Sequence, residues 1–546
     1  MIRTMGHLLP HPRSTAVFAL VLCSLLASLR APAQQNEDHA FLVRTDDGML
    51  RGIPRPGGGA EFLGIPYAQP PVGKLRWHEP LPPKGWNDVR DATAFAHACA
   101  QPVLGDWNRN DAETSSEDCL YLNVITPIWR PKRPLPVLFW IHGGANVGGA
   151  GSGNLFANGT LPGHGVLLVT INYRLGVFGF FAHPALTQEA EHHESGNYAL
   201  MDQILALRWV IDNIARFGGD PKNITVAGQS AGAEDTGLLM TSRAKGWFHK
   251  AIAESGTPLL VAIPPLSAAE KTGEAFAEML HAPAGDAALP FLRGLSTEEI
   301  LKAAVDADPA HHPQIGPDID GWVLTRSPAH VFAAGEESAI PMLIGSNTIE
   351  SGSSATPGKL RAMIQKYAGD LAPQALALYG LSTGGHGQSD PGNNDPLYGA
   401  AADQWSADTR FRCPATTQAG WHAAAKHPTF VYQFDRAIPG HEAEGARHSG
   451  ELAYVFGAFP RAGNIGGNYG QADSRLAYQI ETYWTNFMKT GNPNAADLPH
   501  WPEFNAAQKY LEFTEDCNAV ASAGPQRPAQ CELYRQILAT RMKQKP

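Results

Sequence analysis

A serine between two glycines is the first residue of this 546-residue sequence whose type and setting point to chemistry. Residues 228–232 read Gly-Gln-Ser-Ala-Gly; they follow an apolar run at 224–227 and precede a helix-like stretch that begins at Ala231. A tight turn from a strand into a helix strains the backbone of such a serine and exposes its hydroxyl at the edge of a sheet. The N-terminus of the helix adds partial positive charge, which would stabilise an oxyanion. The pattern therefore predicts that Ser230 is a nucleophile, the alternative being a plain glycine turn.

A second glycine-rich turn could supply the hydrogen-bond donors that such a nucleophile needs. Residues 142–145 read His-Gly-Gly-Ala and end the apolar run 137–141. In proteins with this kind of nucleophile turn, backbone N–H groups of the upstream loop and of the residue after the serine bind the oxyanion. The sequence therefore predicts an oxyanion hole formed by Gly144, Ala145 and Ala231. The alternative is that the two glycines only make a turn.

Strands and helices must alternate around these turns to hold them in place. Near-continuous apolar runs, typical of buried strands, occur at 137–141, 166–173, 224–227, 341–345 and 429–434. Residues 199–217 have helical spacing, and the stretch between 260 and 340 is mostly helical in character. This alternation predicts an α/β fold with a central, mostly parallel sheet and helices on both of its faces. Residues 381–397 are rich in Gly, Ser, Asn and Asp and are predicted to form an exposed loop.

The N-terminus has the composition of a secretory signal peptide. Residues 1–13 carry Arg3 and Arg13 without an acidic residue, an apolar run covers 16–29, and Ala-Pro-Ala stands at 31–33. The apolar run is short for a membrane-spanning helix, although an uncleaved anchor is the alternative. Cleavage after residue 33 would remove three arginines, so that the net charge of −10 would become −13. We therefore expect an exported protein, periplasmic or secreted, without a stable membrane anchor. The acidic balance argues against a nucleic-acid partner.

Further motifs identify a family resemblance across nearly all of the chain after residue 33. Residues 62–71 read Phe-Leu-Gly-Ile-Pro-Tyr-Ala-Gln-Pro-Pro, residues 116–123 Ser-Glu-Asp-Cys-Leu-Tyr-Leu-Asn, residues 171–176 Ile-Asn-Tyr-Arg-Leu-Gly, and residues 217–221 Phe-Gly-Gly-Asp-Pro. With these motifs the chain resembles the type-B carboxylesterase family, which includes cholinesterases, fungal lipases and bacterial para-nitrobenzyl esterases. The resemblance implies one α/β-hydrolase domain over 34–546, with helical lid insertions. It also implies hydrolysis of carboxylic esters through a Ser-Glu-His triad and an acyl-enzyme, without a metal or other cofactor.

A serine nucleophile needs a base, and the base needs a carboxylate to orient it. In this fold the three residues follow one another as serine, acid and histidine. Residues 345–352 and 447–457 are similar to the family's acid segment and histidine loop, so the resemblance assigns the acid to Glu350 and the base to His448. The competing residues are Asp403 and Asp408 for the acid and His441 for the base.

Two positions depart from the usual family pattern. The oxyanion loop of the family commonly has a third glycine, and Ala145 occupies that position here. Its methyl group would narrow the acyl site and disfavour esters of bulky tertiary alcohols. Gln229 stands before the nucleophile where the family often has glutamate, which weakens the attraction of a cationic substrate. Ser255 resembles a serine that lies near the triad in the family; the alternative is that it is an ordinary loop serine.

The resemblance also pairs four of the six cysteines. It implies a disulfide between Cys99 and Cys119, and a second between Cys413 and Cys531. A bridge from Cys531 to Cys517, with Cys413 free, is the alternative for the second pair.

The expected substrate is a small-molecule or lipid-like ester, and the sequence does not name it. Lipase, polyester hydrolase, and carbamate or amide hydrolase activities are alternatives on the same site. A non-catalytic binding role is a further alternative, but members with that role typically lose the nucleophile, which is present here. The sequence leaves the oligomeric state open.

Overall fold

The apolar runs of the sequence become strands of one large sheet in the computed structural model, which describes residues 41–259, 262–307, 315–381, 390–461 and 463–543. In spatial order the strands are β16 (Ala519–Ala521), β15 (Leu511–Phe513), β14 (Thr429–Phe434), β11 (Met342–Asn347), β10 (Lys250–Glu254), β9 (Gly219–Gln229), β7 (Leu135–Ile141), β8 (Leu167–Ile171), β6 (Tyr121–Thr126), β4 (Gly59–Pro66) and β3 (Ile53–Arg55). Strands β15 to β8 in this order run parallel, and antiparallel strands occupy both edges. The mostly parallel sheet predicted from the apolar runs is therefore present.

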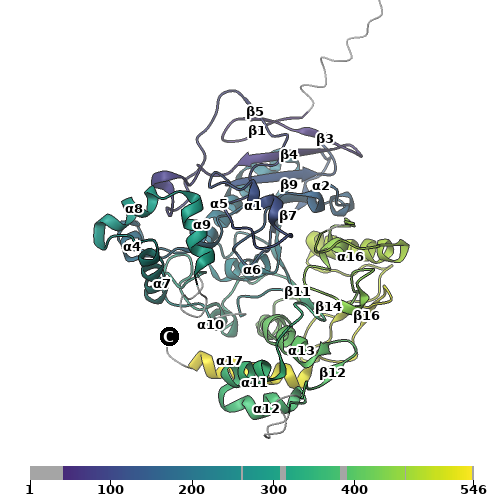
Figure 1. The fold of residues 1–546 in the computed structure, drawn as a ribbon. Coiled ribbons are helices and arrows are strands. Elements are labelled where there is room, and N and C mark those ends of the chain that lie inside the picture. Colours follow the sequence, from purple (N-terminus) through teal and green to yellow (C-terminus); the bar gives the residue numbers. More distant parts are fainter. Residues whose placement is uncertain (1–40, 260–261, 308–314, 382–389, 462, 544–546) are drawn as a thin grey trace, which may run out of the picture. The chain divides into compact units, whose positions relative to one another are not determined.

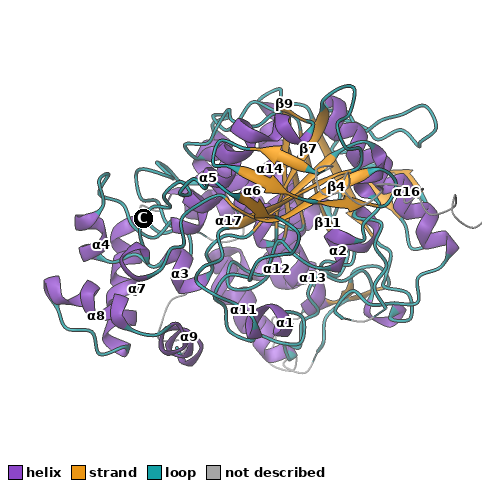
Figure 2. Cartoon of the chain, turned by 90° about the horizontal axis from the view of Figure 1, so that it is seen from above, coloured by secondary structure: helices purple, strands orange, loops and turns teal. Residues whose placement is uncertain are grey.

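Helices lie on both sides of this sheet (Figure 2). The longer helices are α5 (Tyr198–Asn213), α6 (Ala231–Thr241), α14 (Cys413–Ala424), α16 (Gln471–Thr490) and α17 (Pro528–Lys543). Helix α16 packs on a face of the sheet where Trp140, Ala227 and Ile252 join its core. Helix α6 packs against β7, β9 and β10, and α14 packs against β11 and β14. The predicted helix 199–217 ends earlier than expected, because its last turn, Ile214–Phe217, is a 3-10 helix that closes on Gly218.

Two groups of helices interrupt the alternation of strands and helices. Between β10 and β11 lie α7 (Leu266–Met279), α8 (Ala288–Gly294), α9 (Thr297–Asp306) and α10 (Pro328–Ala333). Between β11 and β14 lie α11 (Pro357–Ala368), α12 (Ala372–Leu378) and α13 (Ala401–Ala407). Helices α11 to α13 lie beside α17 (Figure 1) and share a separate apolar core with it. The C-terminal helix thus holds the second insertion in place.

The remaining elements are short. The strands are β1 (Leu42–Arg44), β2 (Met49–Arg51), β5 (Val89–Asp91), β12 (Asn394–Asp395) and β13 (Gly399–Ala400), and the helices are α1 (Arg109–Glu113), α2 (Asn154–Ala157), α3 (Gly176–Phe180), α4 (Pro184–Glu189) and α15 (Leu452–Val455). The described residues from Val43 onward belong to one compact unit. The predicted signal peptide, 1–33, and part of the predicted loop 381–397 lie outside the described residues.

Candidate active site

Ser230 lies in the turn between β9 and α6, with φ 58° and ψ −123°. A backbone hydrogen bond fixes this left-handed conformation: the N–H of Ser230 donates to the carbonyl of Glu254, the last residue of β10, at 2.8 Å. The flanking glycines are required by space: a Cβ atom on Gly232 would lie 2.1 Å from the carbonyl oxygen of Ile141, and one on Gly228 would lie 2.4 Å from the backbone of Gly232. The local sequence therefore forces a sharp turn with the serine at its apex.

Glu350 and His448 meet although they are far apart in the sequence. The imidazole Nδ1 of His448 lies 2.5 Å from Oε2 of Glu350. The backbones are joined as well, since the N–H of His448 donates to the carbonyl of Glu350 at 3.0 Å. The other carboxylate oxygen accepts from the N–H of Asn347 at 2.8 Å. Because the carboxylate accepts at Nδ1, the opposite nitrogen, Nε2, keeps its lone pair for a proton from elsewhere.

The competing acids and the competing histidine have other partners. Asp408 forms a fully buried ion pair with Arg412, and a second one with Arg527 at 3.0 Å. Asp403 accepts from the N–H of Ser353 at 2.6 Å. His441 lies on an exposed turn, 3.5 Å from Glu444. Of the candidates that the sequence offers, the structure brings together Glu350 and His448.

Buried acids surround the imidazole and set its charge state. Burial lowers the pKa of His448, but the charge and hydrogen bond of Glu350, with the charge of Glu451, outweigh burial and raise that pKa above 6.5. Glu451 accepts from Nδ2 of Asn347 at 2.5 Å. Burial and the charge of Glu350 raise the pKa of Glu451 to about 7. Burial likewise raises the pKa of Glu254, which accepts from the indole of Trp484 at 2.7 Å.

Arg412 supports the acid loop in a way that sequence reasoning missed. Its buried guanidinium donates to the carbonyl of Thr348 at 2.5 Å and reaches that of Asn347 at 3.4 Å. Asn347 is the last residue of β11, and Thr348 stands two residues before Glu350. No local signal marks Arg412 for this task, because its partners lie more than sixty residues upstream in the sequence.

Gln229 and Ser255 lie directly behind the nucleophile. The amide Nε2 of Gln229 lies 3.4 Å from Nε2 of His448. Ser255 has φ 50° and its N–H donates to the carbonyl of Gly345 at 2.9 Å. A Cβ atom on Gly256 would lie 2.0 Å from the carbonyl oxygen of Ser230, so this segment packs tightly against the turn.

The loop of Gly144 and Ala145 turns through consecutive left-handed residues, with φ 116° at Gly144, 55° at Ala145 and 59° at Asn146. The amide of Asn146 donates to Asp235 at 3.1 Å, which anchors the loop to α6. Within the described part of the chain, no hydrogen bond occupies the N–H of Gly144, Ala145 or Ala231. These donors are therefore free for a substrate oxygen.

A single cavity of about 1960 Å³ collects these groups. It is lined by Ser230, His448, Gly144, Ala145, Ala231, Gln229 and Ser255, while Glu350 lies buried behind His448. Apolar walls come from several elements, among them Trp107, Phe180 and Phe459. The lining also includes residues of α7, which belongs to the insertion between β10 and β11.

The charged groups on the cavity wall are mainly cationic. Lys271, Arg410 and Arg461 line the cavity, and none of them forms an ion pair with another described residue. The acids among the described lining residues are Asp111 and Glu234. Burial and the charge of neighbouring Asp235 raise the pKa of Glu234 to about 8, and burial raises the pKa of Asp111. The cavity is therefore positive at neutral pH in a chain of net charge −10.

Disulfides join Cys99 to Cys119 and Cys413 to Cys531. Cys517 has no disulfide partner among the described residues, so the structure does not contain the alternative bridge to Cys531.

Of the helices in the described ranges, none combines the length and the apolar character needed to span a bilayer.

Comparisons with known proteins identify the family and the fold of the chain. Residues 39–532 match the model of the carboxylesterase family. The chain is 33% identical over 538 residues to fumonisin B1 esterase of Sphingopyxis macrogoltabida, covering 95% of each chain. It is 34% identical over 542 residues to cocaine esterase of Homo sapiens, covering 92% of each. A solved thermophilic PNB esterase aligns with a TM-score of 0.78 at 32% identity, over 91% of this chain and 100% of the other. The sheet and its flanking helices are thus the α/β-hydrolase fold.

Proposed function

The chain belongs to the carboxylesterase family and is a carboxylic ester hydrolase, and from this premise we propose that Ser230, His448 and Glu350 are its catalytic triad. The observation that carries the proposal is the 2.5 Å contact between His448 and Glu350. His448 lines the same cavity as Ser230, so the oriented imidazole and the hydroxyl share one space. The three residues follow the carboxyl ends of β9, β11 and β14, which are parallel strands of one sheet.

In the proposed reaction, Nε2 of His448 takes the proton of Ser230 as Oγ attacks the ester carbonyl. The N–H groups of Gly144, Ala145 and Ala231 hold the resulting oxyanion. His448 then gives its proton to the leaving alcohol, and an acyl-enzyme remains on Ser230. The same imidazole activates a water molecule that hydrolyses the acyl-enzyme. Glu350 stays ionised and orients the imidazole throughout.

Gln229 is proposed to assist by its amide, which donates toward Nε2 of His448 in the free enzyme. This contact keeps the imidazole pointed into the cavity until a substrate arrives. Ser255 is proposed to support the turn through its backbone, which links β10 to β11 behind Ser230. Neither residue takes part in bond making.

Ser230→Ala is the direct test of the nucleophile. We expect the variant to lose hydrolysis of para-nitrophenyl butyrate by about 10⁴-fold or more, since triad members act as a unit. Its thermal unfolding should match that of wild type, and it should no longer form a covalent adduct with a phosphonate ester probe. An adduct that persists on the variant would place the nucleophile elsewhere.

We propose further that the substrate is a bulky ester with an anionic group. The large cavity and its three unpaired cations support this proposal, as does neutral Gln229, which offers no charge to a cationic ligand. A lipase, polyester hydrolase or amide hydrolase would use the same triad. Rates on a triglyceride, a polyester film and an anilide, compared with rates on short esters, separate these activities.

Residues 34–546 are proposed to act as one catalytic domain after removal of residues 1–33. The two disulfides support export, because disulfides persist in oxidising compartments. Intact mass of the protein recovered from the periplasm and from the medium tests both statements. A mass that includes the first 33 residues would contradict them.

A further inference from the structure

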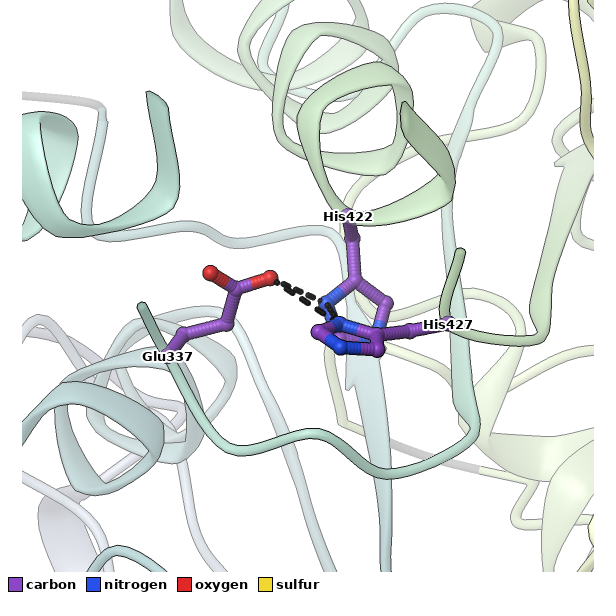
Figure 3. Close-up of side chains that lie close together, drawn as sticks. All are labelled: Glu337, His422 and His427. Atoms are coloured by element: carbon purple, nitrogen blue, oxygen red, sulfur yellow. Dashed lines mark hydrogen bonds and ion pairs between the residues drawn. The ribbon is translucent and has the colours of Figure 1, made fainter. Parts of the chain in front are cut away.

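The side chains of Glu337, His422 and His427 point toward one another (Figure 3). Glu337 precedes β11 and His427 precedes β14, so both lie at the amino ends of strands whose carboxyl ends carry Glu350 and lead to His448. His422 lies in the last turn of α14. The triad chemistry uses none of these three side chains.

Three ligand atoms lie within bonding reach of one point. Oε1 of Glu337 lies 2.6 Å from Nδ1 of His422 and 3.4 Å from Nδ1 of His427. The two Nδ1 atoms are themselves 3.4 Å apart. The side chains of Glu337 and His422 are fully buried, whereas that of His427 is 15% exposed. The cluster therefore has one side open toward solvent.

The hydrogen-bond geometry directs two ring nitrogens of the cluster at one carboxylate oxygen. Nε2 of His422 lies 2.8 Å from the carbonyl oxygen of Ile340, which can only accept, so this nitrogen carries the hydrogen. Nδ1 of His422 then faces Oε1 of Glu337, and Nδ1 of His427 faces the same oxygen. Two ring nitrogens therefore face one carboxylate oxygen, and each would need its own hydrogen to bond to it. The second oxygen, Oε2 of Glu337, is buried and has no hydrogen-bond partner among the described residues.

We propose that Glu337, His422 and His427 bind one divalent transition-metal ion of the Zn²⁺ type. Two imidazole nitrogens and a carboxylate form a common ligand set for Zn²⁺. Tetrahedral ligands at Zn²⁺ distances lie about 3.3 Å apart, close to the two separations of 3.4 Å seen here. Only the contact between Glu337 and His422 must widen. The open side near His427 admits water as a fourth ligand.

The ion would act on the fold rather than on the ester. It would join the end of α14 to the segments that lead into β11 and β14, far from the strand ends that carry the triad. His422 and His427 are five residues apart, a spacing that zinc-binding histidines also use, whereas Glu337 lies 85 residues before His422 and no local pattern links it to them. Hydrolysis should therefore proceed with or without the ion, while unfolding should respond to it.

The test uses the full exported chain without an affinity tag, stripped with a chelator and then dialysed. Calorimetric titration with Zn²⁺ should show one site in wild type, and Co²⁺ should give visible absorption bands of a tetrahedral site. His427→Gln, whose side chain lies at the solvent-facing side, should weaken binding at least about tenfold. His330→Gln, an exposed histidine on neighbouring α10, is the matched control and should bind like wild type. Mg²⁺ should not compete, because it prefers oxygen ligands.

Zn²⁺ should also raise the melting temperature of wild type and of His330→Gln, but not that of His427→Gln. Ser230→Ala should bind the ion like wild type, which separates this result from the fate of the proposed triad. Glu337→Gln keeps the size of the side chain and should lose the site as well. Equal Zn²⁺ affinity in wild type and His427→Gln, or no site in wild type, would overturn the proposal and leave a proton-shared cluster.

Discussion

Backbone strain gathers at the residues that surround the cavity. Ser230, Ala145, Ser255 and Glu350 all have φ between 50° and 58°, a region that side-chain-bearing residues rarely adopt. Backbone hydrogen bonds hold two of them in place. The N–H of Ser230 donates to the carbonyl of Glu254, and the N–H of Glu350 donates to the carbonyl of Ala446. Such strain persists where neighbouring structure fixes it, and it aims the hydroxyl and the carboxylate.

Ala145→Gly should relieve one of these strained positions. Left-handed backbone costs a non-glycine residue about 1 kcal/mol, so we expect the variant to unfold at equal or higher urea concentration. Loss of the methyl group should also widen the acyl side of the cavity. The ratio of tert-butyl acetate to n-butyl acetate hydrolysis is expected to rise. An unchanged ratio would mean that other residues limit access.

The acid limb of the pH profile should report His448. The base acts when it is neutral, so activity is retained above its pKa and falls as the pH drops through that value. Glu350 raises the pKa of His448, and the midpoint of kcat/KM is therefore expected above 6.5. Glu350→Gln should move the midpoint to lower pH and reduce kcat by about 10³- to 10⁴-fold.

His441→Gln is the control for that profile, because His441 is an exposed histidine without contact to Glu350. It should leave both the rate and the midpoint unchanged. If instead His441→Gln moves the acid limb and Glu350→Gln does not, the assignment of the pair is wrong.

At the scale of elements, the acid loop depends on the second half of the chain. Arg412 links the loop after β11 to Asp408, and Asp408 links it to Arg527 just before α17. Cys413, the next residue after Arg412, is bonded to Cys531 on α17. The C-terminal helix thus supports the segment that carries Glu350.

Removing this bridge should therefore cost stability. The Cys413→Ser, Cys531→Ser double variant opens a loop of 118 residues, and we expect its free energy of unfolding to fall by about 3–5 kcal/mol. Urea unfolding followed by tryptophan fluorescence measures the change. Cys517→Ser, at a cysteine without a disulfide, should unfold like wild type; a similar loss there would point to a general effect of serine substitution.

At the scale of the molecule, the cavity combines loops and helices from distant parts of the chain. Arg410 precedes α14, Arg461 follows α15, and Lys271 belongs to α7. Their charges are not paired with the wall acids; burial raises the pKa of Glu234 to about 8 and also raises the pKa of Asp111. We therefore expect substrate preference to depend on the assembled insertions rather than on the proposed triad.

The Arg410→Gln, Arg461→Gln double variant tests this preference. The ratio of kcat/KM for a para-nitrophenyl monoester of glutaric acid to that for para-nitrophenyl butyrate should fall about five- to tenfold, because each solvated charge pair contributes about 1 kcal/mol at most. Added salt should reduce the same ratio in wild type. Arg133→Gln, an exposed arginine outside the cavity, should leave the ratio unchanged.

The sequence by itself determined the features that depend on neighbours along the chain. Apolar runs predicted the buried strands, because a strand covered on both faces needs apolar side chains at nearly every position. The turn around Ser230 was also predictable, since Gly228 and Gly232 are where strand and helix leave no room for a side chain. The assignment of Glu350 and His448 as the proposed acid and base required a family resemblance, because neither residue differs locally from other acids and histidines.

Only the tertiary structure decided which distant residues meet. It brought Glu350 to His448 across 98 positions, paired Asp408 with Arg527 across 119 positions, and joined Cys531 to Cys413. It also brought together the proposed metal ligands Glu337, His422 and His427 and placed the cations Lys271, Arg410 and Arg461 around one cavity. Such contacts follow from the order of the parallel strands and from the packing of the insertions between them. Burial then raises the pKa of enclosed acids such as Glu234 and Glu451. Periodicity along a chain carries no record of that order.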